Sequence, residues 1–262
     1  MNRDVVLIVL GSIAGGLLKI IGGLFFGSNT LFVDALTSFA NLLALFVVLY
    51  FKRATMMPAD SDHHFGHERF EYVGVLVTML AYSFAAGVSV ARLSSLRDYS
   101  VGIEAFYLAV ASIIAYLPPV LLSRKMSSSL RVYGEFTASE FIESSVGIVA
   151  TIGGALYSYL IDFSGALLLT GFIFYELLNN GKGLVEIMVD TAPPLNIYEE
   201  VVKEAEDLGL KIEAIRLRRL SHTKFHGDIL VKGGKDMVEK VSKLKKTLKT
   251  QYGVDVCVEM KE

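Results

Sequence analysis

Six long apolar stretches dominate this sequence. They cover residues 4–26, 30–51, 71–92, 102–122, 137–160 and 164–183. The hydrocarbon core of a bilayer is about 30 Å thick, so a helix needs roughly 20 mostly apolar residues to cross it. A single stretch of this kind can be a buried helix of a soluble protein, but six in series predict a multi-pass membrane protein. The first stretch leads directly into the others and is too long for the apolar core of a signal peptide, so we expect it to be retained.

Charge separates the chain into two parts. Of its 25 Lys and Arg residues, 14 follow Ala192. We therefore expect an all-α transmembrane domain of six helices over residues 1–191 and a small cytoplasmic domain over residues 192–262. The formal net charge of −2 shows no excess of basic residues of the kind that binds nucleic acid. A single cysteine, Cys257, excludes an internal disulfide framework and a cysteine-rich zinc site.

Basic residues in the loops predict how the chain is oriented. If both termini lie on one side, the segments of that side hold Arg3, Lys52, Arg53, Arg69, Arg124, Lys125, Arg131 and Lys182, and the opposite loops hold only Arg92 and Arg97. An excess of Lys and Arg in short loops marks the cytoplasmic side. We therefore expect a protein of the cell membrane (plasma or inner) with both termini in the cytoplasm.

Beyond Pro194 the pattern becomes that of a small soluble domain. Helical periodicity covers residues 196–208 and 235–251, and strand-like alternation covers 211–219, 225–232 and 254–260. Gly209 is placed to end the first of these helices. The order predicts an α+β domain with its helices on one face of a small sheet. Because such a core is small, we expect the domain to form a homodimer.

Polar residues inside two of the apolar stretches are the first candidates for function. They are Asp34, Thr37, Ser38 and Asn41 in the second stretch and Ser139, Glu140, Glu143 and Ser144 in the fifth. Their spacing places each set on one helix face. A carboxylate in hydrocarbon costs several kcal/mol unless it faces a cavity, a partner or an ion, so facing sets predict converging oxygen ligands for a metal. Hydrogen bonding between helices is the alternative for the uncharged members, and Lys19 is a candidate partner for Asp34.

Three of the five histidines fall in one short segment, PADSDHHFGH at residues 58–67. Glu68, Arg69 and Glu71 follow it. Imidazole and carboxylate groups at this density suit zinc and other divalent transition metals. A solvent-exposed polar loop that binds no metal is the alternative.

The pattern DxxHxFGHxRxE, from Asp60 to Glu71, resembles the loop between the second and third spans of the cation diffusion facilitator family. The strings SNTLFVDALTSFANLL in the second stretch and DTAPP at residues 190–194 extend the likeness over most of the chain. Members of this family are divalent-metal/proton antiporters that carry zinc, iron, manganese or related ions out of the cytosol. The resemblance implies six spans and a ferredoxin-like (metallochaperone-like) C-terminal domain.

The family's transport site takes a His or Asp and then an Asp four residues later, from each of the second and fifth spans. The positions here that match this pattern are Thr37, Asn41, Ser139 and Glu143. No histidine remains among them, so the resemblance implies an all-oxygen site that suits manganese, magnesium, calcium or ferrous iron better than zinc. The alternative is a shift by one residue, which turns Asp34 and Glu140 inward, with Ser38 in support. We expect Glu143 to exchange protons in either case.

The loop positions carry over from the family more directly. Asp60, His63 and His67 match its second metal site, and Asp62 and His64 are further candidate ligands. The family often binds a zinc pair in the cytoplasmic domain through His and Asp. The corresponding positions here are Glu213, Ile229, Cys257 and Glu259, so that site is largely lost.

His222 and His226, near the first hairpin of the small domain, are candidates for a displaced metal site, and surface histidines without a metal are the alternative. The sequence shows no nucleophile–base pair and no phosphate-binding glycine loop, so we expect no enzyme and no organic cofactor. We expect efflux of a divalent cation (Mn, Fe or Zn) in exchange for protons. A metal sensor that has lost transport, and a transporter of a different cation, are the alternatives.

Overall fold

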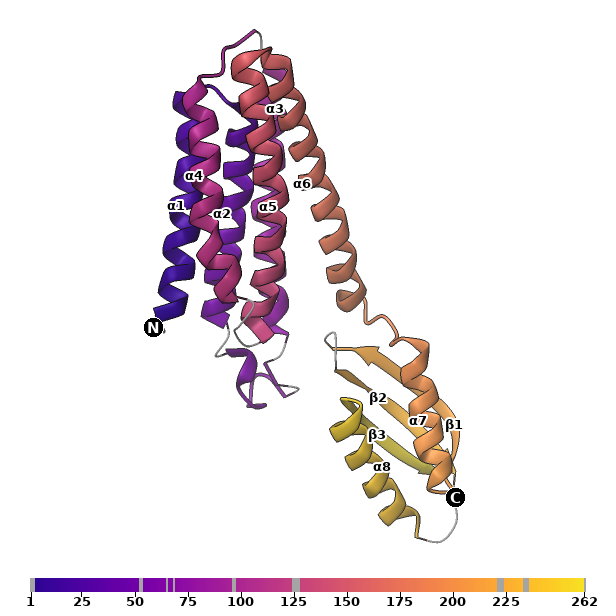
Figure 1. The fold of residues 1–262 in the computed structure, drawn as a ribbon. Helices are drawn as coiled ribbons and strands as arrows, with labels where there is room; N and C mark the ends of the chain where they lie inside the picture. The colour runs from indigo at the N-terminus through magenta and orange to yellow at the C-terminus, as the bar shows by residue number, and fades with distance from the viewer. Residues whose placement is uncertain are drawn as a thin grey trace. The chain divides into compact units, whose positions relative to one another are not determined.

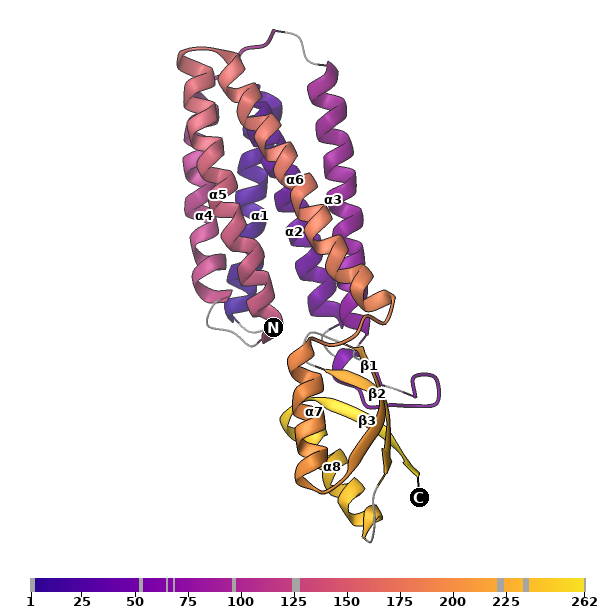
Figure 2. The same ribbon diagram turned by 90° about the vertical axis from the view of Figure 1, so that its right-hand side faces the viewer.

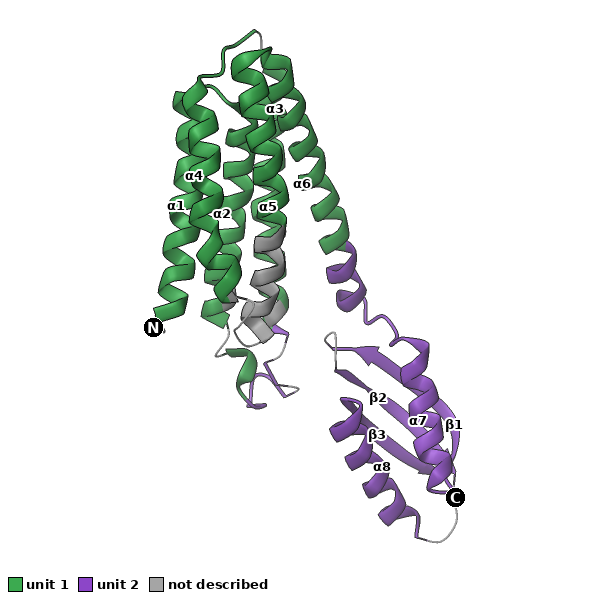
Figure 3. Ribbon diagram, viewed as in Figure 1, with its two compact units in different colours: residues 1–57, 70–181 green, residues 58–69, 182–262 purple. Residues whose placement is uncertain are grey.

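The structure, a computed structural model, describes most of the chain. It covers residues 3–51, 54–64, 66–67, 69–95, 98–123, 128–220, 224–232 and 236–261, and of these only the backbone for residues 48, 71, 123 and 128–138. Backbone contacts divide the chain into two compact units (Figure 3). Unit 1 comprises Met1–Met57 and Phe70–Gly181, and unit 2 comprises Pro58–Arg69 and Lys182–Glu262. Unit 2 therefore includes the loop at 58–69 as well as the C-terminal domain.

The six apolar stretches form six long helices (Figure 1). These are α1 (Arg3–Phe25), α2 (Asn29–Phe51), α3 (Phe70–Ser95), α4 (Ile103–Ser123), α5 (Ser128–Leu156) and α6 (Tyr159–Met188), with a short 3-10 helix, η1 (Ala54–Met56), after α2. Five of them, all except α5, are long and apolar enough among the described residues to cross a membrane. Glu140, Glu143 and the serines beside them make α5 more polar than the rest. The sixth span stays a prediction.

The turn between α5 and α6 lies inside the fifth apolar stretch. That stretch extends to residue 160, whereas α5 ends at Leu156 and α6 begins at Tyr159. Ser158 explains the difference, because its backbone N–H still bonds to Gly153 while its hydroxyl accepts a hydrogen bond from the Leu160 N–H. A serine that bonds to the first free amides of a helix fixes where the helix begins. A hydropathy pattern does not reveal such a cap, so the sequence did not predict the turn.

Within unit 1, α2 occupies a central place. It packs against α1, α3 and α5, and α4 packs against α1 and α5 (Figures 1 and 2). Val33 of α2, Tyr82 of α3 and Ile173 of α6 belong to one buried cluster. Large apolar side chains such as Phe84 and Leu178 remain exposed, as suits helices surrounded by lipid. The residues that line the centre of unit 1 are therefore those of α2.

Small residues let α1 approach its neighbours. A Cβ atom at Gly15 would overlap the ring of Tyr116 on α4. Tyr116 is buried against α1, and its hydroxyl donates a hydrogen bond to the backbone oxygen of Ser12. Close approach through small residues is a common way of packing helices in membranes. As a result, Lys19 on α1 lies deep inside the bundle, with no exposed side-chain surface.

The C-terminal part of unit 2 has the predicted order of elements. It consists of α7 (Leu195–Asp207), β1 (Lys211–Arg219), β2 (Phe225–Lys232), α8 (Met237–Gln251) and β3 (Val254–Lys261). The sheet order is β1-β2-β3, with β1 and β2 antiparallel and β2 and β3 parallel. Alternate residues of β2 are buried, and they pack with both helices in one core, which includes Val201, Ile229 and Leu244. Both helices therefore cover the same face of the sheet.

Gly209 follows α7 as predicted, with a positive φ of 68°. Its N–H bonds to the backbone oxygen of Glu206, and the Leu210 N–H bonds to that of Ala205. A left-handed glycine after the last turn is a common way to end a helix, because glycine carries no Cβ to oppose that conformation. The turn directs the chain into β1 at Lys211.

Candidate metal centre

The polar set of α2 is buried inside unit 1. Asp34, Thr37, Ser38 and Asn41 expose at most 2% of their surface. Their spacing along the helix places them on one face, as the sequence predicted. This face meets α5, which packs directly against α2.

The residues of the polar set of α5 differ in how deeply they are buried. Glu140, Glu143 and Ser144 are buried, whereas Ser139 is only partly so. Gly147, one turn further on, brings the two helices together, because a Cβ atom there would lie 3.6 Å from Asp34 Oδ2. The carboxylates of α5 are therefore directed at α2.

Three carboxylates from the two helices converge. Asp34, Glu140 and Glu143 each offer an oxygen, and these oxygens lie within 4.8 Å of one another. We call these three residues the buried carboxylate group. Of the positions predicted from the family pattern, Glu143 belongs to this group, and Glu140 stands in it rather than its neighbour Ser139.

The uncharged residues of α2 hold the group in place. The Thr37 hydroxyl donates to Glu143 Oε2 at 2.6 Å, and the Asn41 amide donates to Glu140 Oε1 at 2.7 Å. Tyr82 of α3 in turn positions Asn41, because its hydroxyl donates a hydrogen bond to Asn41 Oδ1 at 2.7 Å. The ionised Glu140 carboxylate can only accept, so the NH2 end of the Asn41 amide faces it and Oδ1 faces Tyr82. Thr37 and Asn41 are thus in direct contact with carboxylates of the group.

Lys19 carries the positive charge nearest to the group. Its Nζ atom lies 2.7 Å from Asp34 Oδ1 and 2.6 Å from Glu140 Oε2. The pairing with Asp34 confirms the partner that the sequence indicated, and the second pairing, with Glu140, could not be read from the sequence. A lysine within an apolar stretch is the signal that pointed to this region.

Two buried oxygens near the group form no hydrogen bond of regular geometry among the described residues, although the Ser144 hydroxyl lies close enough to interact with the Asp34 carboxyl. They are Asp34 Oδ2 and Ser144 Oγ. Buried polar atoms are almost always paired, so unpaired ones call for an explanation such as an ion or water. The ligand atoms around them are carboxylate and hydroxyl oxygens, which suit hard divalent cations such as Mn²⁺, Mg²⁺ and Ca²⁺. The chemistry of this region is therefore that of an all-oxygen cation site.

A second group lies in the loop of unit 2. Asp60, His63 and His67 each offer an atom within 4.8 Å of the others, and we call these three residues the loop triad. Asp60 Oδ1 lies 3.4 Å from His63 Nδ1, and Asp60 Oδ2 lies 3.3 Å from His67 Nε2. Asp62 and His64, the further candidates, are exposed, and the group of converging atoms does not include them. The triad offers nitrogen and oxygen ligands together, as zinc sites do.

Backbone hydrogen bonds shape the loop triad. The N–H groups of Asp62 and His63 both donate to Asp60 Oδ1, at 3.0 and 2.8 Å. The bond from His63 holds the pKa of the Asp60 carboxyl below its usual range, with the bond from Asp62 adding to it. His67 is fixed from the other side, with Nδ1 at 3.1 Å from the Pro58 backbone oxygen. That oxygen can only accept, so Nδ1 carries the proton and Nε2 of a neutral His67 has the lone pair that a metal ligand needs.

The described candidates in the C-terminal domain belong to neither of these two groups. His222 lies outside the described residues. His226, partly buried on β2, stands opposite Asp255, while Cys257 and Glu259 are exposed on β3 and stand opposite Asp228 and Leu230. Within the described part of the chain, the sets of three acid, imidazole or thiol groups close enough to share an ion are the buried carboxylate group and the loop triad. A metal site in the domain stays a prediction.

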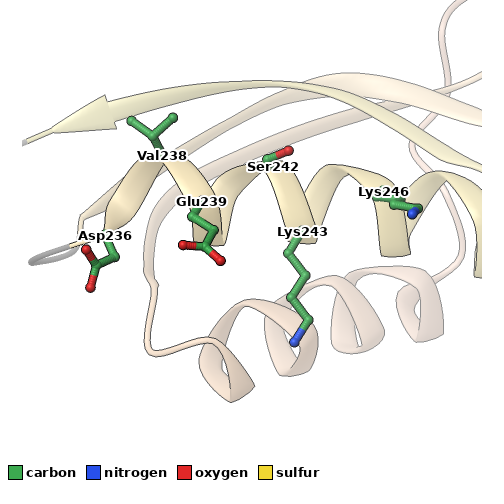
Figure 4. Close-up of a pocket in the computed structure, with 6 residues that line it drawn as sticks. All are labelled: Asp236, Val238, Glu239, Ser242, Lys243 and Lys246. Atoms are coloured by element: carbon green, nitrogen blue, oxygen red, sulfur yellow. The ribbon is translucent and has the colours of Figure 1, made fainter.

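A pocket of unit 2 opens along α8 (Figure 4). It is lined by Asp236, Val238, Glu239, Ser242, Lys243 and Lys246. All of these belong to α8 or to the residue before it, and their side chains are spread along the helix rather than directed at one point. The arrangement fits the solvated helix face that the lysine-rich sequence suggests.

The sequence did not predict the contacts of two further carboxylates. Asp190, after α6, accepts hydrogen bonds from Arg69 at 2.9 Å and from Arg218 at 3.1 Å. Burial acts to raise the pKa of the Asp190 carboxyl, but the two guanidinium groups outweigh it and hold this pKa below its usual value. Asp162 of α6 is fully buried, and its side chain accepts hydrogen bonds from Ser28 and from the Asn29 N–H. Both contacts join residues far apart in the chain, which is why local patterns gave no signal.

Comparison with known proteins identifies relatives of the whole membrane part. A family model of the cation efflux transmembrane domain matches residues 5–189. The manganese efflux system protein MneP of Bacillus subtilis is 25% identical in an alignment that covers 92% of this chain and 90% of that protein. An uncharacterized transporter of Methanocaldococcus jannaschii is 23% identical over 221 residues, 78% of this chain and 76% of that protein. The matched span contains both the buried carboxylate group and the loop triad.

Proposed function

Because this chain belongs to the cation efflux family, we propose that it exports a hard divalent cation, Mn²⁺ in the first place, from the cytosol in exchange for protons. The observation that carries the proposal is the convergence of three buried carboxylates from α2 and α5. Carboxylates in the membrane are costly, and they mark ion pathways when they face the interior of a bundle.

The choice of Mn²⁺ rests on the ligand chemistry. The buried carboxylate group supplies carboxylate oxygens and its neighbour Thr37 a hydroxyl oxygen, and no imidazole or thiol belongs to the group. Oxygen-only ligands favour manganese over zinc, relative to sites with nitrogen or sulfur. The name of the Bacillus subtilis relative agrees with this choice, although at 25% identity it supports the class of cation more than the ion itself.

In the proposed cycle the ion binds between α2 and α5 from the cytosolic side. Glu143 holds it together with oxygens of Asp34 and Glu140, and Thr37 positions Glu143 through its 2.6 Å hydrogen bond. A rocking of the helices then exposes the group to the other side of the membrane. Metal ligands must be deprotonated, so protons arriving from outside compete for the carboxylates and release the ion. We assign the main exchange to Glu143.

The remaining features of the proposal follow from the loops and the small domain. We propose that six helices cross the cell membrane, with both termini in the cytoplasm, and that the C-terminal domain joins two chains in a homodimer. The loop triad then lies on the cytosolic side, where it gathers ions or stabilises the loop. Its mixed ligands and exposure suit a regulatory role better than passage through the membrane.

The test is metal flux in proteoliposomes loaded with a metal-sensitive dye, with Mn²⁺, Fe²⁺, Zn²⁺, Mg²⁺ and Ca²⁺ offered separately. We expect Mn²⁺ flux accompanied by counter-movement of protons, read with a pH dye. Glu143→Gln should abolish both signals without loss of folded protein. Glu176→Gln is the matched control, since Glu176 lies on α6 with its carboxylate bonded to Asn180. Unchanged Mn²⁺ flux in Glu143→Gln would reject the assignment.

One observation favours a second candidate, a metal sensor that has lost transport. Lys19 already forms ion pairs with oxygens of two carboxylates in the buried group. Such ion pairs can stabilise the fold without any transported metal ion. Mn²⁺ binding without any flux in the same proteoliposomes would support the sensor. If sodium competes with Mn²⁺ at comparable concentration, a carrier of monovalent cations is favoured instead.

A further inference from the structure

The ammonium of Lys19 is fully engaged inside the membrane part of the protein. Its Nζ donates to Asp34 Oδ1 at 2.7 Å, to Glu140 Oε2 at 2.6 Å and to Ser38 Oγ at 2.9 Å. An ammonium has three donors, so all of them are in use. Tyr116 covers the remaining side, with its ring centroid 4.6 Å from Nζ.

The oxygens that Lys19 holds belong to the buried carboxylate group itself. Asp34 Oδ1 and Glu140 Oε2 come from two of its three carboxylates. A cation bound by the group therefore lies within a few ångströms of the ammonium, where like charges repel strongly in a low-dielectric interior. Lys19 and a bound metal ion thus compete for the same negative charge.

The formal charges fit this competition. Three ionised carboxylates and one ammonium leave two negative charges, the number that one divalent cation neutralises. Without Lys19 the group would hold a divalent ion with one negative charge to spare. A site that binds its ion too tightly releases it slowly, and conduction requires binding weak enough to allow exit.

This chain also shows that a buried carboxylate needs no lysine. Asp162 is as fully buried as Asp34, yet its side chain is satisfied by the Ser28 hydroxyl, the Asn29 N–H and the Tyr99 hydroxyl. Its direct hydrogen-bond donors are neutral, and the Arg92 guanidinium lies beside them, bonded to Asn29 Oδ1. At Asp34 and Glu140, by contrast, the cation itself is in direct contact with both carboxylates.

Resting on the proposed efflux function, we propose that Lys19 is a tethered cation that weakens and balances metal binding at the buried carboxylate group. It holds Asp34 Oδ1 and Glu140 Oε2, so the transported ion shares these two carboxylates with the ammonium and binds Glu143 and Asp34 Oδ2 directly. By remaining in the site it keeps affinity for a divalent ion moderate and its release fast. Lys19 is in this sense a positioning and affinity-setting residue.

The decisive variant is Lys19→Met, studied as purified full-length protein with MnCl₂ as the probe. A purely structural ion pair predicts weaker Mn²⁺ binding or none, because its loss disorders the carboxylates. The tethered cation predicts the opposite sign: about tenfold tighter Mn²⁺ binding in equilibrium dialysis, from the loss of one repelling charge at close range. Turnover at saturating Mn²⁺ should fall by about tenfold, because release becomes limiting. Lys182→Met, at an exposed position on α6, is the control.

A second comparison keeps the test valid if Lys19→Met does not fold. Asp34→Asn should weaken Mn²⁺ binding, and the double variant Lys19→Met/Asp34→Asn, which has the formal charge of the native group, should recover at least about tenfold of that affinity. Absence of this recovery, or Mn²⁺ affinity in Lys19→Met equal to or weaker than in the native protein, overturns the proposal.

These outcomes are separate from those of the efflux function. If the native protein binds Mn²⁺ but moves none, export is rejected, and the affinity comparison still decides the role of Lys19. If the native protein transports Mn²⁺ and the Lys19 variants bind and transport it equally well, export stands and only the tethered cation is rejected.

Discussion

The buried carboxylate group and the loop triad are both sets of three converging ligands, but they are built in different ways. The first lies between α2 and α5 with its side chains at most 2% exposed, and a lysine neutralises part of its charge. The second lies in a short loop where Asp60 is 45% exposed and backbone N–H groups hold the carboxylate in place. Burying the carboxylate group costs desolvation free energy that the surrounding helices must offset. The loop triad, in contrast, is held by hydrogen bonds within one short segment.

This difference indicates which group does what. A charge inside the membrane persists only where other residues or an ion compensate it, so the buried group is the part of the molecule suited to moving a cation. The loop triad combines imidazole and carboxylate, which bind transition metals tightly in water. The two groups therefore differ in ligand chemistry, with nitrogen and oxygen in the loop triad and oxygen alone in the buried carboxylate group.

The largest effect is expected when a buried ligand is removed. Glu140→Ala leaves the Lys19 ammonium with one carboxylate and the Asn41 amide without its acceptor. Breaking a buried ion pair by removing one partner costs about 3–5 kcal/mol. We expect a lower melting temperature in detergent and no measurable Mn²⁺ flux. Glu104→Ala, an exposed position in the first turn of α4, should leave both unchanged. Native stability in Glu140→Ala would contradict the comparison.

A smaller effect is expected in the loop. His63→Ala with His67→Ala removes two ligands of the triad without exposing a buried charge. Loss of supporting interactions at metal sites typically changes affinity by about 10–100-fold, so we expect the apparent affinity for metal or the transport rate to change at the lower end of that range. Thermal stability should stay near that of the native protein. His64→Ala is the matched control, since His64 is exposed and outside the triad. If neither affinity nor rate changes, the loop is a scaffold only.

Much of this arrangement could be predicted from the sequence, because it follows from local patterns. Hydropathy located the long helices, alternation located β1 and β2 to the residue, and histidine density located the loop triad. The cost of two charges in apolar stretches made Lys19 one candidate partner for Asp34, and the structure pairs them. In each case one physical rule acts within a single segment.

The register of α5 could not be predicted with the same certainty. Adjacent residues of a helix differ by about 100° in direction. Ser139 and Glu140 therefore compete for the position facing α2, and only packing decides between them. The structure buries Glu140 because Lys19, Ser38 and Asn41 all contact its carboxylate. Those partners come from two other helices, so no pattern within α5 contains the information. The contacts of Asp190 with Arg69 and Arg218 are non-local in the same way.

An exchange of ligand type sharpens the comparison further. Thr37→His places an imidazole beside Glu143 in the buried group, as the loop triad has beside Asp60. Nitrogen ligands favour zinc, so we expect the ratio of Zn²⁺ to Mn²⁺ transport to rise by about tenfold. Thr37→Val, which removes the hydroxyl without adding nitrogen, should weaken Mn²⁺ transport and leave the ratio unchanged. A rise in the ratio with valine as well would mean that the loss of the hydroxyl, and not the imidazole, sets the preference.

The smallest effect concerns how the loop responds to pH. The His63 and Asp62 N–H groups hold the pKa of the Asp60 carboxyl below its usual range, so the ionised form stabilises the loop. This contribution is present above the usual carboxyl pKa and is lost as the pH falls through the lowered value. We expect the His63 amide proton resonance to shift over that acidic range. Asp60→Asn keeps an oxygen acceptor for both N–H groups but has no charge to titrate, so the shift should disappear while metal binding at the triad weakens. A shift that persists in Asp60→Asn would assign the acid response to another group and leave the triad without its proposed anchor.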